Sequence, residues 1–158
     1  MVKLGVNMIK IVIADDLEKW RTLCERYVSQ LESLYGPIGR VFCNSPDSAL
    51  AALRSFTSTD LSVLVTDIDF TEDEHEKGGL QLMQEVRRDS ALCGIPIIGM
   101  TSNPAYEPRI GDQSAIYVPK PRFNPVMYDA LEHILKNGER EWSDVYKLWG
   151  EHKKACGI

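Results

Sequence analysis

Short apolar runs alternate along this chain with longer segments of helical period. The runs that read as β-strands are Met8–Ala14, Val41–Cys43, Leu61–Thr66, Ile95–Met100 and Ile116–Val118. They are apolar enough to be buried on both faces, which is typical of parallel strands. Each parallel link needs a crossover, usually a helix, and the crossover is almost always right-handed. The alternation therefore predicts an α/β fold, a doubly wound sheet of five parallel strands with helices on both faces.

The segments between the runs carry helix signals. Apolar side chains recur at i, i+3 and i+4 from Glu18 to about Leu34, and Gly36 and Pro37 then favour a stop. Ser45, Pro46 and Asp47 form a strong helix start, with a cap, a proline in the first turn and an acid at the positive end of the dipole. Two further helices are predicted at 79–88 and at about 124–136, the second ending at Asn137 and Gly138.

Two parts of the pattern depart from this rhythm. Pro104 and Pro108 limit any helix before the last strand to about one turn, so a short or irregular fourth helix is expected. The end of the chain predicts an extra C-terminal helix from Glu139 to about Lys153, with an apolar face of Trp142, Val145, Tyr146 and Trp149. This face could contact a partner or a second copy, but packing on its own domain is the favoured interpretation.

Composition excludes several classes of protein. The 158 residues are 44% hydrophobic and 26% charged, as in ordinary soluble globular domains. A net charge of -5 argues against broad binding to nucleic acid or to anionic membranes, and no run is long enough for a membrane helix. Cys24, Cys43, Cys93 and Cys156 are scattered without metal-binding spacing, so reduced thiols and a cytoplasmic location are expected.

Polar residues follow four of the apolar runs. Asp15 and Asp16 come after the first, Asp67 after the third, Thr101 after the fourth and Lys120 near the end of the fifth. The carboxyl ends of parallel strands lie along one edge, so these groups are expected to converge there. Three crowded carboxylates repel one another unless a cation neutralises them. Mg²⁺ suits such a site because it binds carboxylate and carbonyl oxygens and keeps several waters.

In this order the residues resemble the receiver domain of two-component response regulators. The resemblance rests on the acidic pair, on Asp67, on Thr101 and on the run Tyr117-Val118-Pro119-Lys120-Pro121, and it covers about residues 8–137. It implies the flavodoxin-like strand order 2-1-3-4-5. The expected division is an N-terminal arm at 1–7, a receiver domain at 8–137 and a C-terminal helical extension at 138–158. The length after Asn137 leaves no room for an output domain, so a single-domain receiver is expected.

The resemblance also implies the metal site. By analogy, Mg²⁺ is bound by Asp16, by Asp67 and by the backbone carbonyl of Asp69, and Asp15 supports it through water. Asp67 is then the phosphoacceptor, a nucleophile that forms an aspartyl phosphate.

Three further roles follow from the same resemblance. Lys120 offsets charge on the phosphoryl oxygens, Thr101 hydrogen-bonds the new phosphoryl group, and Tyr117 changes rotamer to report it. The chain is thus expected to be a switch and not an enzyme. Its expected partners are a sensor histidine kinase or a histidine phosphotransfer protein and a downstream protein, and a homodimer is a further option.

Two alternatives remain open. Residues 67–71 match the DxDxT signature of haloacid dehalogenase-like phosphatases, in which the first Asp is the nucleophile. Those enzymes place the signature on their first strand and their acidic pair near the end, whereas here the acidic pair comes first. The other alternative is a receiver-like interaction module that is never phosphorylated.

Two details depart from the usual receiver pattern. The stretch between Asp67 and Gly79 is longer than usual and acidic, with Glu72, Asp73, Glu74 and Glu76, so an anionic donor is expected to approach less easily. Asp69 is an additional acid beside the phosphoryl site. Its side chain is expected to alter the lifetime of the phosphorylated state, in a direction that the sequence does not give.

Overall fold

The computed structural model describes residues 8–70 and 78–157, in which a parallel β-sheet forms the centre of the molecule. The strands follow the order β2-β1-β3-β4-β5, and every neighbouring pair is parallel. Their bounds are β1 Ile9–Ala14, β2 Ile38–Cys43, β3 Leu61–Asp67, β4 Ile97–Thr101 and β5 Ile116–Pro119. The predicted fold class and strand order are confirmed.

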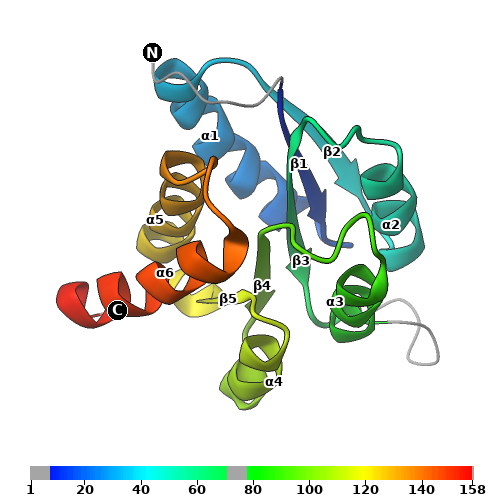
Figure 1. Cartoon of the computed structure of the whole chain (residues 1–158). Helices are drawn as coiled ribbons and strands as arrows, with labels where there is room; N and C mark the ends of the chain where they lie inside the picture. Colours follow the sequence, from blue (N-terminus) through cyan, green and yellow to red (C-terminus); the bar gives the residue numbers. More distant parts are fainter. Residues whose placement is uncertain (1–7, 71–77, 158) are drawn as a thin grey trace.

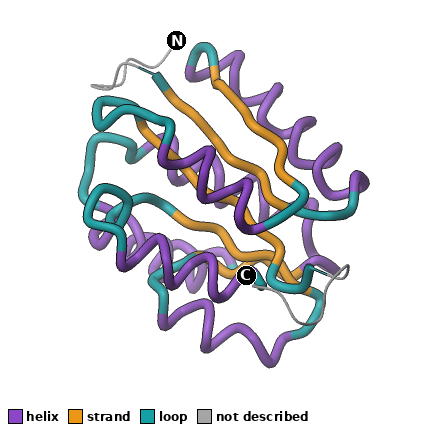
Figure 2. The backbone as a smooth tube through the Cα atoms, turned by 90° about the vertical axis from the view of Figure 1, so that its right-hand side faces the viewer, coloured by secondary structure: helices purple, strands orange, loops and turns teal. Residues whose placement is uncertain are grey.

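Helices cover both faces of this sheet. Their bounds are α1 Glu18–Tyr35, α2 Pro46–Arg54, α3 Gly79–Arg88, α4 Glu107–Asp112, α5 Phe123–Lys136 and α6 Trp142–Cys156. One face packs against α1, α5 and α6, and the other against α2, α3 and α4. Figure 1 shows the first group to the left of the sheet and α2 and α3 to its right, and Figure 2 shows the strands running side by side between helices.

The central strands are buried on both sides, as their apolar runs predict. Ile11 and Ile13 of β1 join the core under α1 and α5, whereas Val12 and Ala14 join the core under α2 and α3. All of these side chains are inaccessible to solvent. The two-residue period of a strand sends successive side chains to opposite faces, so one strand supplies both cores.

Several predicted boundaries need correction, and the larger differences are in β2, β4 and α6. Strand β2 begins at Ile38 and not at Val41, because Ile38, Gly39 and Arg40 pair with β1 from its first residue onward. Strand β4 begins at Ile97 and not at Ile95. Helix α6 begins at Trp142 rather than at 139, and it runs to Cys156. The local sequence pattern is weakest at element ends, where pairing and packing decide the boundary.

The helix signals in the sequence correspond to observed caps. The Ser45 side chain accepts a hydrogen bond of 3.2 Å from the Ser48 amide, and Pro46 opens α2. Helix α1 ends at Tyr35, and its C-cap Gly36 has a φ of 86°, in the left-handed region that glycine tolerates. The fourth helix is short, as expected: a 3₁₀ turn at Pro104–Tyr106 leads into the six residues of α4.

Helix α6 packs on its own domain. Trp142, Val145 and Trp149 are buried, and Tyr146 is half-buried. The Trp142 indole donates a hydrogen bond of 2.6 Å to the carbonyl of Ser114, which lies just before β5. The favoured interpretation of the aromatic face is thus confirmed, and a homodimer through other surfaces stays a prediction. Among the residues described, no helix is both long and apolar enough to cross a membrane.

Two expectations concern residues outside those described. The N-terminal arm at 1–7 is one of them, and the acidic stretch Glu72–Glu76 is the other.

Candidate functional site

The sheet brings the strand-end residues to one edge. Ala14 of β1 pairs with Thr66 of β3, so Asp15 and Asp67 follow at the same level. Thr101, the last residue of β4, pairs with Pro119 of β5, and Lys120 comes next. The convergence expected from the sequence is therefore observed.

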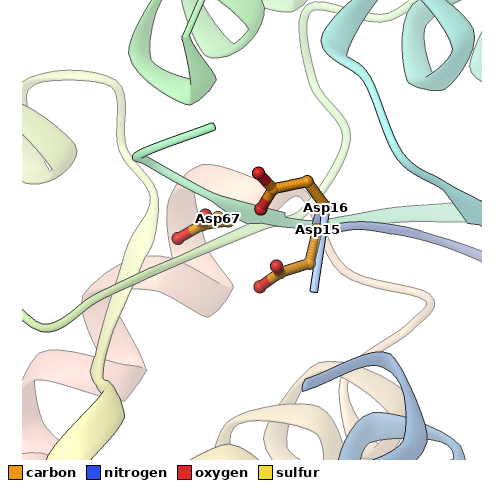
Figure 3. Close-up of side chains that lie close together, drawn as sticks. All are labelled: Asp15, Asp16 and Asp67. Atoms are coloured by element: carbon orange, nitrogen blue, oxygen red, sulfur yellow. The ribbon is translucent and has the colours of Figure 1, made fainter. Parts of the chain in front are cut away.

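Three carboxylates form a cluster at this edge. One carboxylate oxygen from each of Asp15, Asp16 and Asp67 lies within 4.8 Å of the others. Figure 3 shows the side chains of Asp15 and Asp16 leaving the end of β1 toward the side on which Asp67 lies. Asp15 is inaccessible to solvent, Asp67 is 2% exposed and Asp16 is partly exposed. The cluster is thus open to solvent mainly at Asp16.

Lys120 contacts two of these acids. Its Nζ lies 3.0 Å from Oδ1 of Asp67 and 3.3 Å from Oδ2 of Asp15, and the lysine side chain is only 8% exposed. Burial raises the pKa of Asp67 to about 7, and the charge of Asp15 adds to this while Lys120 opposes it. Burial likewise raises the pKa of Asp15. One ammonium does not compensate three neighbouring carboxylates, so the site favours a further cation.

The donor set fits a hard divalent cation. Oδ2 of Asp15 is buried and accepts no hydrogen bond from the described residues, with the Lys120 ammonium as its charged neighbour. Carboxylate oxygens are the ligands that Mg²⁺ prefers, and no soft sulfur or imidazole ligand joins the cluster among the residues described. Asp15, Asp16 and Asp67 are the residues that could hold such an ion.

Backbone contacts hold Asp15 in place. Its amide donates to the carbonyl of Cys43 at 3.0 Å, and its Oδ1 accepts a hydrogen bond of 2.8 Å from the Leu17 amide. The Arg21 guanidinium donates to the Asp15 carbonyl at 2.9 Å. The turn from β1 into α1 is therefore built around Asp15, and its carboxylate keeps one oxygen directed toward Lys120.

A glycine determines how closely α3 approaches Asp67. A Cβ placed on Gly79 would lie 1.9 Å from the carbonyl oxygen of Asp67, which no side chain tolerates. The Gly79 amide donates to the carbonyl of Ile68 at 3.0 Å, which ties the start of α3 to the end of β3. The glycine thus permits the close contact that positions Asp67.

Thr101 and Asp69 are joined beside the cluster. Thr101 is fully buried, and its hydroxyl accepts a hydrogen bond of 3.0 Å from the Asn103 amide. The same hydroxyl donates to Oδ2 of Asp69 at 3.4 Å. The Asp69 amide hydrogen-bonds the Asp67 carboxylate and counters the rise in its pKa. The Asp69 carbonyl as a metal ligand stays a prediction.

Tyr117 of β5 pairs with Gly99, two residues before the end of β4 at Thr101. It is half-buried and packs against the core on the α2–α3–α4 face. With Tyr146 and Trp149 it lines a cavity of about 270 Å³ between α4, β5 and α6. The C-terminal helix is thus a direct neighbour of the residue expected to change rotamer.

Known structures share the fold of this chain. No family model matches the sequence, and no curated protein matches it. The chemotaxis protein CheY4 of Vibrio cholerae superposes with a TM-score of 0.60 at 16% identity, over 82% of this chain and 98% of that one. A two-component response regulator from Clostridium difficile has a TM-score of 0.65 at 15% identity, over 84% of this chain and all of that one.

The receiver domain of the stress response regulator RcsB from Escherichia coli is 22% identical, with a TM-score of 0.63, over 85% of this chain and 97% of its own length. This chain has the fold of CheY-like receiver domains. Identities this low show the fold alone. The chemistry of the site depends on the side chains of this chain.

Sequence reasoning missed part of this site. The Trp20 ring lies against Lys120, and Arg21 hydrogen-bonds the Asp15 carbonyl, yet the sequence marks Trp20 only as one apolar position of α1. No local signal distinguishes these residues, because their contacts are made with the distant Lys120 and with the backbone of Asp15.

Proposed function

We propose that this protein is a phosphoacceptor receiver of a two-component or phosphorelay system, with Asp67 as the accepting residue. The observation that carries the proposal is the environment of Asp67. Its carboxylate is nearly buried at the end of β3, 3.0 Å from the Lys120 ammonium and within the cluster formed with Asp15 and Asp16. A nucleophile, a cation and a site for a metal ion are the parts that phosphoryl transfer to a carboxylate requires.

The proposed reaction is an in-line displacement. An Asp67 oxygen forms a bond to phosphorus, and the bond from phosphorus to the donor breaks with its electron pair going to the leaving group. Lys120 stays close enough to Asp67 to offset charge on the transferred oxygens. A Mg²⁺ ion held by Asp16, Asp67 and the Asp69 carbonyl, with Asp15 through water, would neutralise the charge that develops on phosphorus-bound oxygens.

The proposed output is a change of partner binding. Thr101 is buried next to Asp69 and would turn its hydroxyl to the new phosphoryl group. Tyr117 would then change its packing against α4 and α6, which line the same cavity. The donor would be a sensor histidine kinase or a histidine phosphotransfer protein in the cytoplasm, and the receiver of the signal another protein. The chain would turn over no substrate beyond its own aspartyl phosphate.

The phosphatase alternative is less well supported. Asp67 is the last residue of the third strand, and Asp69 follows it in the loop. Asp67 lies beside the acidic pair that follows the first strand. The order of those groups is that of a receiver, and Thr71 of the DxDxT signature lies outside the described residues. An interaction module that keeps the fold without phosphorylation is the remaining alternative.

One experiment separates the three functions. The protein is incubated with acetyl phosphate and Mg²⁺, and its mass is compared with that of Asp67→Asn. A Mg²⁺-dependent gain of one phosphoryl group that the variant lacks supports the receiver. Sustained hydrolysis of a generic phosphate ester would support the phosphatase, and no gain with no hydrolysis would leave the interaction module.

A further inference from the structure

An aromatic ring lies against the lysine of the site. The Nζ atom of Lys120 is 4.8 Å from the centre of the Trp20 ring, within the range of a cation–π interaction. The same ammonium contacts Asp67 and Asp15, and its side chain is 8% exposed. Lys19 also reaches the Trp20 ring, at 5.0 Å, but it is exposed and so gains less from this contact.

Trp20 is held from two sides. It lies in the first turn of α1, where its amide donates to the carbonyl of Leu17 at 3.2 Å, and Leu17 is itself bound to Oδ1 of Asp15. On the other side its ring contacts Phe123, with ring centres 5.2 Å apart and an angle of 56° between the planes. Phe123 is buried and opens α5 just after Lys120. The ring is therefore placed relative to both the acids and the lysine.

The lysine needs this support for a physical reason. A lysine ammonium is a point charge on a flexible stem of four carbons. Fixing its position by hydrogen bonds alone costs much side-chain conformational entropy. Asp67 and Asp15 attract the ammonium from one side. The strength of this attraction changes when a cation or a phosphoryl group binds at the carboxylates. The Trp20 ring is uncharged and keeps its attraction in every state of the site.

We propose that Trp20 is a positioning residue for the phosphoryl transfer at Asp67, and that its ring keeps the Lys120 ammonium directed at the accepting carboxylate. The inference rests on the proposed function. It requires that the π face, and not only the volume, of the side chain matters, since Leu fills space without attracting a cation.

The initial rate of Mg²⁺-dependent phosphorylation by acetyl phosphate tests the role. We expect Trp20→Leu to be roughly three- to tenfold slower than the wild type and Trp20→Phe to lie between them. Tyr27→Leu is the matched control, because Tyr27 belongs to the same helix and stacks on Phe123 at 5.9 Å, and no cation–π contact is described for its ring. This control should react at the wild-type rate once folding is verified by circular dichroism.

A double-mutant cycle distinguishes positioning from packing. In a Lys120→Met background, Trp20→Leu should cause no further loss of rate, because no ammonium remains to be positioned. A second readout needs no phosphorylation. The fluorescence emission of Trp20 is obtained as the difference between the wild-type spectrum and that of Trp20→Phe. This emission should change when Lys120 is replaced by Met. It tests the contact even if the Lys120→Met variant takes up no phosphoryl group.

The outcomes separate the inference from the function on which it rests. A wild type that gains no phosphoryl group overturns the proposed function, and the role of Trp20 with it. A wild type that is phosphorylated while Trp20→Leu reacts equally fast overturns only the role of Trp20. The role of Trp20 is also overturned if Trp20→Leu slows phosphorylation by the same factor in the Lys120→Met background as in the wild type. It is overturned likewise if Lys120→Met leaves the emission of Trp20 unchanged.

Discussion

The hydroxyl of Thr101 donates a hydrogen bond to the carboxylate of Asp69, with 3.4 Å between the two oxygens. The residue expected to bind an incoming phosphoryl group thus already has an anionic partner. A phosphoryl group on Asp67 would compete with Asp69 for the same proton and would also be repelled by its charge. This relationship gives the extra acid of the DxD sequence a physical role beside the acceptor.

The first prediction concerns Asp69. Replacement by Asn removes the negative charge and weakens the hydrogen bond from Thr101. We therefore expect a higher steady-state level of Asp67 phosphorylation. Weakening a charged hydrogen bond of this kind should change the phosphorylation or dephosphorylation rate by about two- to fivefold. Phosphorylation and dephosphorylation rates, measured separately by mass, check it. Equal rates in both proteins would remove Asp69 from the mechanism.

The second prediction concerns the metal. A ligand that binds only the folded state at 100 times its Kd stabilises it by about 2.7 kcal/mol. For a domain of this size that raises Tm by roughly 5–10 °C. We expect Mg²⁺ to produce such a shift in the wild type, and Asp16→Asn to lose most of it because this variant lacks one of the expected carboxylate ligands.

Asp69→Asn provides the control for the metal prediction. Its backbone carbonyl, and not its side chain, is the expected ligand, so the Mg²⁺-induced rise in Tm should persist. Loss of the rise in this variant would place the Asp69 carboxylate itself at the metal and contradict the expected ligand set.

The third prediction concerns α6. Trp149 is 3% exposed and packs in the core formed with α5. Trp149→Ala should lower the free energy of unfolding by about 3–5 kcal/mol, as for other buried tryptophans. Lys154→Ala on the exposed side of α6 should change it by less than about 0.5 kcal/mol. Urea denaturation followed by circular dichroism measures both.

Truncation after Gly138 extends the third prediction. Because the aromatic face of α6 is buried against its own domain, the shortened chain should be a monomer of lower thermal stability. A shortened chain that keeps its Tm but loses self-association would instead identify α6 as a dimer contact.

The fourth prediction concerns pH. His133 lies between α5 and α6, with its Nε2 2.9 Å from the carbonyl oxygen of Val145. Burial lowers its pKa below the ordinary value of 6.5; the hydrogen bond to Val145 opposes this, whereas electrostatic interaction with His152 and Lys136 adds to it. Between pH 6.5 and the lower folded-state pKa the unfolded chain therefore binds more protons, and stability falls as the pH falls.

His133→Gln isolates this contribution from that of the acidic cluster. Gln can still donate a hydrogen bond to Val145 but does not titrate, so the difference in unfolding free energy between wild type and variant should shrink or change sign as the pH drops from 7 to 5. Chemical denaturation at several pH values measures it. A difference that stays constant over this range would contradict a lowered pKa of the half-buried imidazole.

The fold and the acidic cluster were largely readable from the sequence because their signals are local. A strand such as Ile9–Ala14, buried on both faces, must be apolar throughout, and a polar residue directly after it must lie at the sheet edge. That reasoning placed Asp15, Asp67 and Thr101 without any knowledge of contacts. The same reasoning placed the start of β2 too late. Ile38 and Gly39 belong to the strand because they pair with β1, and not because of their own sequence pattern.

The sequence by itself determined the α/β class, the order of the elements and the groups at the edge of the sheet, since all three follow from period, capping and the ends of apolar runs. Only the tertiary structure decided that Trp20 contacts Lys120, that Asp69 binds Thr101 and that α6 lies beside Tyr117. The physical reason is that each of these contacts joins segments distant in sequence. Their geometry depends on how two elements pack, and no local pattern encodes it.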